Sequence, residues 1–182
     1  YATTIPFLVF FLYQMMFVII TPALMTGAFA GRMKFASYLW FLVFWVLLVY
    51  APVAHWSWGG GWMQRMGFID FAGGVVVHVT AGAGALASVF AIGKRNLAKK
   101  EDLSPSNLTY VALGAALLWF GWFGFNGGSA LASNGLAARA WVNTMLSAAA
   151  AMMTWLFADW HQNHRPSAAA PLIGSVVGLV AI

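Results

Sequence analysis

The chain has 182 residues, of which 62% are hydrophobic and only 7% are charged. Soluble domains usually carry about 25% charged residues, so this composition excludes an ordinary soluble domain and predicts a polytopic membrane protein. The net charge of +5 does not indicate a nucleic-acid binder, because the charges cluster between apolar runs. The absence of cysteine excludes disulfides and thiolate metal sites.

A membrane-spanning helix needs about 20 mostly apolar residues. The first such segment is Thr4–Ala30, which is followed by Arg32 and Lys34. Within it, Gln14, Phe17 and Thr21 share one helical face by their spacing. Gln and Thr on such a face are typical of polar contacts between membrane helices.

The second predicted span covers Ser37–Ala54 and the third covers Asp70–Ile92. The sequence HWSWGGGWMQR lies between them, and its tryptophans suit the aromatic belt at a membrane interface. A carboxylate at the start of the third helix, Asp70, is favoured by the positive end of the helix dipole.

The third span holds a single histidine, His78, among glycine, alanine and valine. Its segment VVVHVTAGAGALA also contains G-x-G-x-x-A after a β-branched run, which is one mark of a dinucleotide-binding turn. That interpretation requires a strand, a soluble helix and an acidic residue about 20 positions on, and only Glu101 and Asp102 in a polar loop are available. We therefore prefer a membrane helix.

On a membrane helix Gly74, His78 and Gly82 share a face, so the imidazole has open space on either side along the axis. Two roles remain open for it: a core histidine bonded to a neighbouring helix, or a group lining a pathway. Burial disfavours the imidazolium form, so we expect a neutral ring that both donates and accepts a hydrogen bond.

The fourth span is predicted over Leu108–Ala130, the fifth over Ala138–Trp160, and a sixth begins near Ala169 and continues to Ile182. In the fourth span Trp122, Phe125 and Ser129 share a face, with Asn126 beside them. From spacing alone this face fits aromatic packing better than a binding site. His161 and His164 follow the fifth span at a spacing of three; without further ligands, we expect no metal there.

Lysine and arginine predict the orientation of these spans. They concentrate in the first and third loops, and Arg165 lies in the fifth, whereas the second and fourth loops hold only Arg65 and Arg139. The positive-inside rule therefore places the three basic loops in the cytoplasm. Both chain ends fall in apolar runs, so we expect residues 1–182 to form one transmembrane domain that is an internal piece of a longer protein, with further helices on either side.

The run DFAGGVVVHVTAG resembles the signature of the ammonium transporter family, which includes the Amt, Mep and Rh proteins. Three further blocks agree with it in order and spacing: YQMMFVIITPALMTGAFA, AHWSWGGGW and WFGWFGFNGGSA. The resemblance covers essentially the whole chain. It implies about the third to the eighth span of an eleven-helix, inverted-repeat fold that assembles as a homotrimer.

The resemblance also implies roles for individual residues. Trp58 and Ser129 would recruit ammonium at the outer face, and Phe17 would face the recruited cation. Phe17 and Phe125 would form the pore gate. His78 and Trp122 would line the pore, and Asp70 would be a structural carboxylate near the recruitment site. The implied ligands are ammonium or ammonia and the lipid bilayer of the cell membrane, with a PII-type regulator on the cytoplasmic face, no cofactor and no catalytic residues.

Two positions depart from the family pattern: Gly31 stands where many members have glutamate, and Val75 where many have threonine. The second pore histidine of the family would lie after Ile182. Two rival functions stay open within the same fold, namely an ammonium sensor with a cytoplasmic signalling domain and an Rh-like channel for the neutral amine. An enzyme is disfavoured, because one histidine and a distant aspartate make no catalytic pair.

Overall fold

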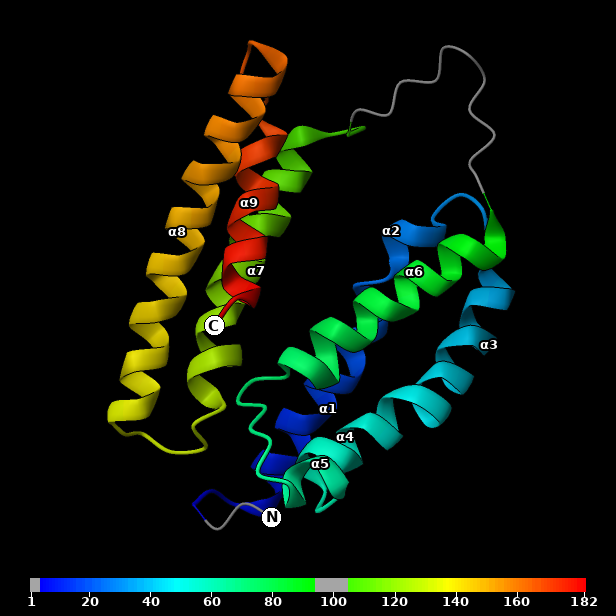
Figure 1. The fold of residues 1–182 in the computed structure, drawn as a ribbon, viewed down its shortest axis with the longest axis vertical. Coiled ribbons are helices and arrows are strands. Elements are labelled where there is room, and N and C mark those ends of the chain that lie inside the picture. The colour runs from blue at the N-terminus through cyan, green and yellow to red at the C-terminus, as the bar shows by residue number, and fades with distance from the viewer. Residues whose placement is uncertain (1–3, 94–104) are drawn as a thin grey trace. The chain divides into compact units, whose positions relative to one another are not determined.

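The structure is a computed structural model that describes residues 4–93 and 105–182. Every regular element in these two ranges is a helix, and five helical segments there are long and apolar enough to cross a membrane. The prediction of an all-α, multi-pass membrane protein is therefore confirmed. The chain divides into two compact units, Tyr1–Lys100 and Glu101–Ile182, each of which is described by itself (Figure 1).

The first span of the first unit is broken near its end. Helix α1 (Phe7–Ala23) is followed by a short α2 (Thr26–Phe29), where the sequence predicted one helix over Thr4–Ala30. Pro22 stands in the last turn of α1 and has no backbone N–H to donate, so the regular ladder stops there. The hydroxyl of Thr26 donates to the carbonyl of Ala23 at 2.8 Å and joins the two pieces.

The second span is longer than Ser37–Ala54. It runs through α3 (Phe35–Trp45), the wide π-helical turn η1 (Val46–Tyr50) and α4 (Ala51–Trp58), and the short helix α5 (Trp62–Arg65) follows. Pro52 lacks a backbone donor, and the wide turn lies directly before it.

The third span begins at Gly74, four residues after the predicted start at Asp70. It consists of the π-helical turn η2 (Gly74–Val79) and α6 (Thr80–Ile92). Because VVVHV lies in η2 and not in a strand, the structure contradicts the dinucleotide-binding alternative.

Arg32 ties the far ends of α2 and α6 together. Its guanidinium donates to the backbone carbonyls of Ala28 and Gly93, which are the acceptors left over at the ends of these helices. The rest of the predicted third basic loop lies outside the described residues; it comprises Lys94, Arg95, Lys99 and Lys100, with Glu101 and Asp102.

The second unit contains α7 (Leu108–Gly128), α8 (Gly135–Asn163) and α9 (Ala169–Val180). The fifth predicted span starts three residues early because the side chain of Asn134 caps α8, accepting from the N–H groups of Leu136 and Ala137 at 3.0 Å. Helices α8 and α9 pack closely, since a Cβ added at Gly178 would lie 2.6 Å from the Cα of Ala148.

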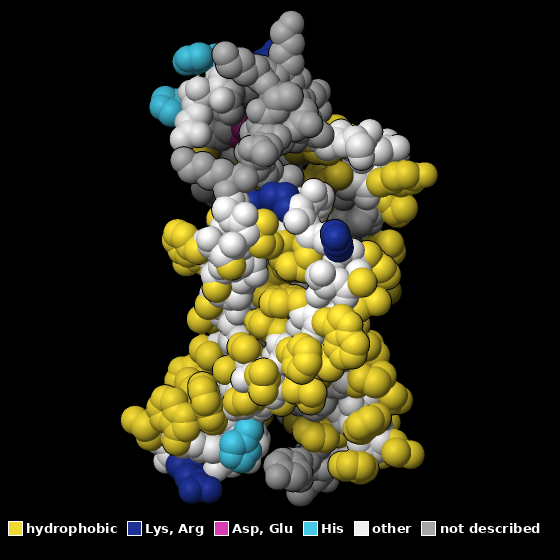
Figure 2. Space-filling model, turned by 90° about the vertical axis from the view of Figure 1, so that its right-hand side faces the viewer, with side chains coloured by type: hydrophobic (Ala, Val, Ile, Leu, Met, Phe, Trp, Pro, Cys, Tyr) yellow, Lys and Arg dark blue, Asp and Glu magenta, His cyan; other side chains and the backbone are white. Residues whose placement is uncertain are grey.

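Large apolar side chains cover much of the outside. Phe7, Phe90 and Phe120 are 69%, 78% and 80% exposed. Figure 2 shows hydrophobic side chains over the middle of one face, with Lys, Arg and His side chains above and below. Such a surface needs lipid or further protein against it.

Candidate functional site

The carboxylate of Asp70 organises the start of the third span. One oxygen accepts from the backbone N–H groups of Gly73 and Gly74 at 2.8 and 2.7 Å. The other accepts from Val75 and Val76 at 3.0 and 2.9 Å. The side chain therefore satisfies the four N–H groups that a helix start leaves unpaired, and its charge lies at the positive end of the helix dipole, as the sequence predicted.

Gly73 allows the backbone to adopt this turn. Gly73 has φ +94°, in the left-handed region that favours glycine. Its carbonyl then accepts from both Val77 and His78, at 2.8 and 3.1 Å, which opens the first turn to the π form. The hydroxyl of Thr80 donates to the carbonyl of Val75 at 2.7 Å and closes this turn.

His78 is consequently held in a π turn whose start is fixed by Asp70, and its side chain is half-buried. The sequence predicted one continuous helix that includes both Asp70 and His78. The helix begins only at Gly74, after Asp70, so this predicted start was wrong. Wide turns of this kind are frequent at functional sites.

Trp58 and Phe17 meet beside this turn. The indole Nε1 of Trp58, at the end of α4, donates to the backbone carbonyl of Asp70 at 2.7 Å. The ring of Phe17 on α1 packs edge-on against Trp58, with ring centroids 5.5 Å apart and an interplanar angle of 86°. Tyr13 packs on the other side of Phe17 at 5.0 Å. The hydrogen bond fixes the orientation of the indole.

In the second unit, the end of α7 carries a second aromatic group. Trp122 and Phe125 stack with centroids 4.7 Å apart and an interplanar angle of 27°. The hydroxyl of Ser129, which follows α7, donates to the carbonyl of Phe125 at 2.8 Å. Trp122 is buried, whereas Phe125 and Ser129 are half-buried.

Asn126 holds the three helices of the second unit together beneath these residues. Its amide nitrogen donates to the hydroxyl of Thr144 on α8 at 3.0 Å and to the carbonyl of Leu179 on α9 at 3.2 Å. The side chain is 1% exposed, so these hydrogen bonds replace those that water would make. The sequence placed Asn126 beside the aromatic face, but only the structure identifies its partners.

The structure thus brings Phe17, Trp58 and Asp70 together, while the roles predicted for them stay predictions. The predicted pairings of Phe17 with Phe125 and of Trp58 with Ser129 join different units, and they stay predictions. No group of three or more His, Cys, Asp or Glu residues that could hold a metal ion occurs in the described part of the chain.

Sequence reasoning missed two contributors to this site. Gly73 was only one of several glycines, and its need for a positive φ was not visible from the letters. Thr80 was not singled out either. A threonine in an apolar helix, two residues after a histidine, was the available signal, because its hydroxyl must bond to a nearby carbonyl in lipid.

Residues 1–182 match the model of the Ammonium Transporter Family along their whole length. The chain belongs to the ammonium transporter family. An ammonium transporter of Bacillus subtilis is 48% identical to it over 182 residues, and the ammonium transporter Amt1 of Archaeoglobus fulgidus is 47% identical over 175 residues. These alignments cover 100% and 96% of the chain.

Solved structures of family members agree with this assignment. The Mep2 proteins of Candida albicans and Saccharomyces cerevisiae superimpose with a TM-score of 0.89 in each case, at 40% and 36% sequence identity, and cover 97% and 100% of the chain. The chain spans 45% and 44% of the two curated relatives and 40% and 42% of the two Mep2 chains. It therefore corresponds to less than half of a family member.

Proposed function

We propose that this chain is part of a membrane protein that conducts ammonium across the bilayer. Membership in the family carries the proposal, together with the cluster of Phe17, Trp58 and Asp70 at the head of the helix that holds His78. The family relationship supplies the permeant. The cluster supplies an oriented aromatic face at the predicted outer end of the span.

The physical problem for such a protein is selectivity. NH4+ is close to K+ in size and charge, and either ion faces a large desolvation cost in an apolar pore. Ammonium can give up a proton, which potassium cannot. We propose that the indole of Trp58 and the hydroxyl of Ser129 concentrate the cation, by cation–π attraction and by hydrogen bonding.

Beyond recruitment, Phe17 and Phe125 would act as the gate, with Trp122 lining the pore beside it. The neutral amine would then pass His78, whose imidazole can accept or donate a hydrogen bond without placing a fixed charge in the membrane. Asp70 would act indirectly: it fixes the turn that orients both the Trp58 indole and the His78 backbone. We expect the full-length protein to form a homotrimer and to bind a PII-type regulator at its cytoplasmic face.

The test replaces His78 in the full-length protein. We expect His78→Ala to abolish or reshape ammonium-dependent currents on solid-supported membranes, while the protein still inserts. His161→Ala is the matched control, since His161 is an exposed histidine in the last turn of α8 and has no role in the proposed pathway. Currents in His78→Ala equal to those of the control would overturn the role of His78. Uptake of labelled amine without current in the parent protein would instead favour a neutral channel.

A further inference from the structure

The chain reverses direction between the first two helices of the second unit. Helix α7 ends at Gly128 and α8 begins at Gly135. The two helices lie side by side (Figure 1). They also pack closely, since a Cβ added at Gly127 would collide with the indole ring of Trp141 on α8. The reversal must therefore be completed within a short and closely confined turn.

The backbone tightens before it reverses. The N–H groups of Ser129, Ala130 and Leu131 each donate to the carbonyl three residues earlier, at 3.2, 3.2 and 2.9 Å. These hydrogen bonds close a tighter turn than those of an α-helix, which reach back four residues. Leu131 then has φ +51°, in the left-handed region, and a residue in this conformation ends the helical path of the chain.

Leucine is a costly residue for this conformation. Its Cβ crowds the following carbonyl oxygen when φ is positive, and glycine avoids that contact. In the described part of the chain only one other residue with a Cβ, His164, has a positive φ. The Cβ also narrows the accessible range of φ and ψ, whereas glycine moves freely through it. Leu131 therefore makes a stiffer turn than glycine would, and strain of this kind is concentrated at functional sites.

Ser129 lies two residues before Leu131 and is held from both sides. On one side its N–H donates to the carbonyl of Asn126, whose side chain is bonded to α8 and α9. On the other side is the turn at Leu131, whose side chain is half-buried. The hydroxyl of Ser129 donates to the carbonyl of Phe125 at 2.8 Å, and a hydroxyl oxygen that donates can also accept from an N–H of ammonium. The direction of this hydroxyl therefore depends on the turn as well as on α7.

We propose that Leu131 is a positioning residue for ammonium recruitment. Its left-handed conformation holds the turn, so that the hydroxyl of Ser129 keeps the direction in which it meets the cation. This inference rests on the proposed role of Ser129, and Leu131 acts through Ser129 without touching the cation. A displaced hydroxyl weakens binding of the cation before it enters the pathway. Loosening the turn therefore raises the ammonium concentration at half-maximal current and leaves the maximal current unchanged.

The test measures ammonium-dependent currents of the full-length protein on solid-supported membranes over a range of ammonium concentrations. Leu131→Gly keeps the left-handed turn without strain but removes its stiffness and its side chain. We expect the half-saturating concentration to rise about threefold to tenfold, which corresponds to the loss of about one hydrogen bond, with the same maximal current. Leu131→Met is the conservative variant. It keeps the Cβ and an apolar side chain, so the half-saturating concentration should return to that of the parent protein.

Ser129→Ala separates this inference from the proposed function. We expect it to raise the half-saturating concentration too, and the double variant with Leu131→Gly to show no further rise, because Leu131 acts only through Ser129. A Ser129→Ala protein with the half-saturating concentration of the parent would overturn recruitment by Ser129, and the positioning role with it.

Two other results would overturn the positioning role alone. In the first, Ser129→Ala is impaired and Leu131→Gly is not. In the second, the two effects multiply in the double variant, which would show that Leu131 acts independently of Ser129. If Leu131→Gly fails to insert, Leu131→Asn takes its place in the same comparisons, because asparagine also tolerates a positive φ.

Discussion

The carboxylate of Asp70 offers the sharpest test of how this structure holds its site. In Asp70→Asn, the amide oxygen can still accept from Gly73 and Gly74. The amide nitrogen, however, replaces the oxygen that accepts from Val75 and Val76 at 3.0 and 2.9 Å, and a donor then faces two donors. The substitution therefore removes two charge-assisted hydrogen bonds at nearly constant volume.

The magnitude follows from those two bonds. A hydrogen bond to a charged group contributes about 1.5–3 kcal/mol, and the lower figure applies because this carboxylate is only partly buried. We expect Asp70→Asn to lower the free energy of unfolding by about 3 kcal/mol, or roughly 100-fold in the folding equilibrium. Asp70→Ala removes all four acceptor contacts and should cost more.

The assay is a denaturation titration of the full-length protein in mixed micelles, followed by tryptophan fluorescence. Asp159→Asn provides a matched control, because the carboxylate of Asp159, near the end of α8, accepts from the side chain of Asn163 and the backbone N–H of Ser167 and caps no helix start. The same chemical change there should shift the midpoint much less. Equal shifts in the two variants would refute the view that Asp70 stabilises the start of the third span.

Three further predictions follow from individual contacts. Trp58→Leu should weaken selection of ammonium in competition with methylammonium. Trp58→Phe should weaken it less, because phenylalanine keeps an aromatic face. Equal selectivity in the parent protein and both variants would contradict cation recruitment by this ring. Gly178→Ala should cost about 2 kcal/mol of stability through overpacking against α8, whereas Gly114→Ala, with nothing within 4 Å of the added methyl, should stabilise α7 slightly in the same unfolding assay. Asn126→Ala should cost about 2 kcal/mol, because it breaks the hydrogen bonds from α7 to α8 and α9, and hydrogen exchange at the end of α7 should increase; unchanged exchange would contradict that linking role.

The amino-acid sequence by itself determined the class of this protein and the number and approximate limits of its spans. Hydropathy is a sum over neighbouring residues, so apolar segments as long as a bilayer is thick are visible without tertiary information. The order and spacing of four sequence blocks were also enough to indicate the family. The predicted limits of the helices differed from the observed ones by a few residues. Pro22 ends a helix because it lacks a backbone donor, and Asn134 and the Asp70 carboxylate accept hydrogen bonds at helix starts. Hydropathy records neither effect.

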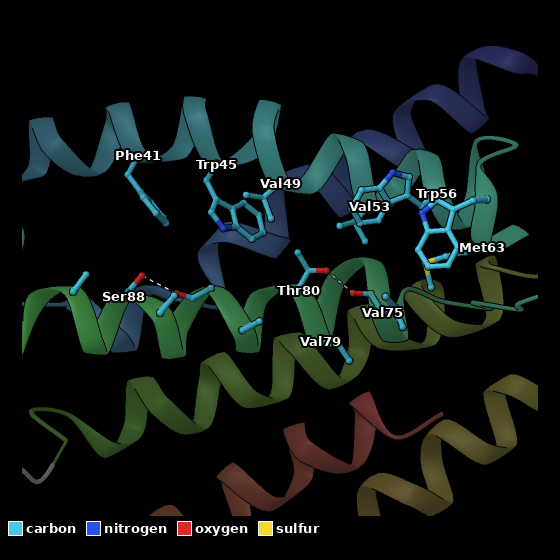
Figure 3. Close-up of a pocket in the computed structure, with 15 residues that line it drawn as sticks. Phe41, Trp45, Val49, Val53, Trp56, Met63, Val75, Val79, Thr80 and Ser88 are labelled. Atoms are coloured by element: carbon cyan, nitrogen blue, oxygen red, sulfur yellow. Dashed lines mark hydrogen bonds between the residues drawn. The ribbon is translucent and has the colours of Figure 1, made fainter.

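Only the tertiary structure decided how the site is built. The hydrogen bond from Trp58 to Asp70 spans 12 residues, and the contact of Phe17 with Trp58 joins different helices. Many partners of equal polarity and size would satisfy the same sequence pattern, so the pairing depends on how the helices pack. The apolar groove that Phe41, Trp45 and Ser88 line could not be predicted from the sequence for the same reason, because its walls come from different helices (Figure 3).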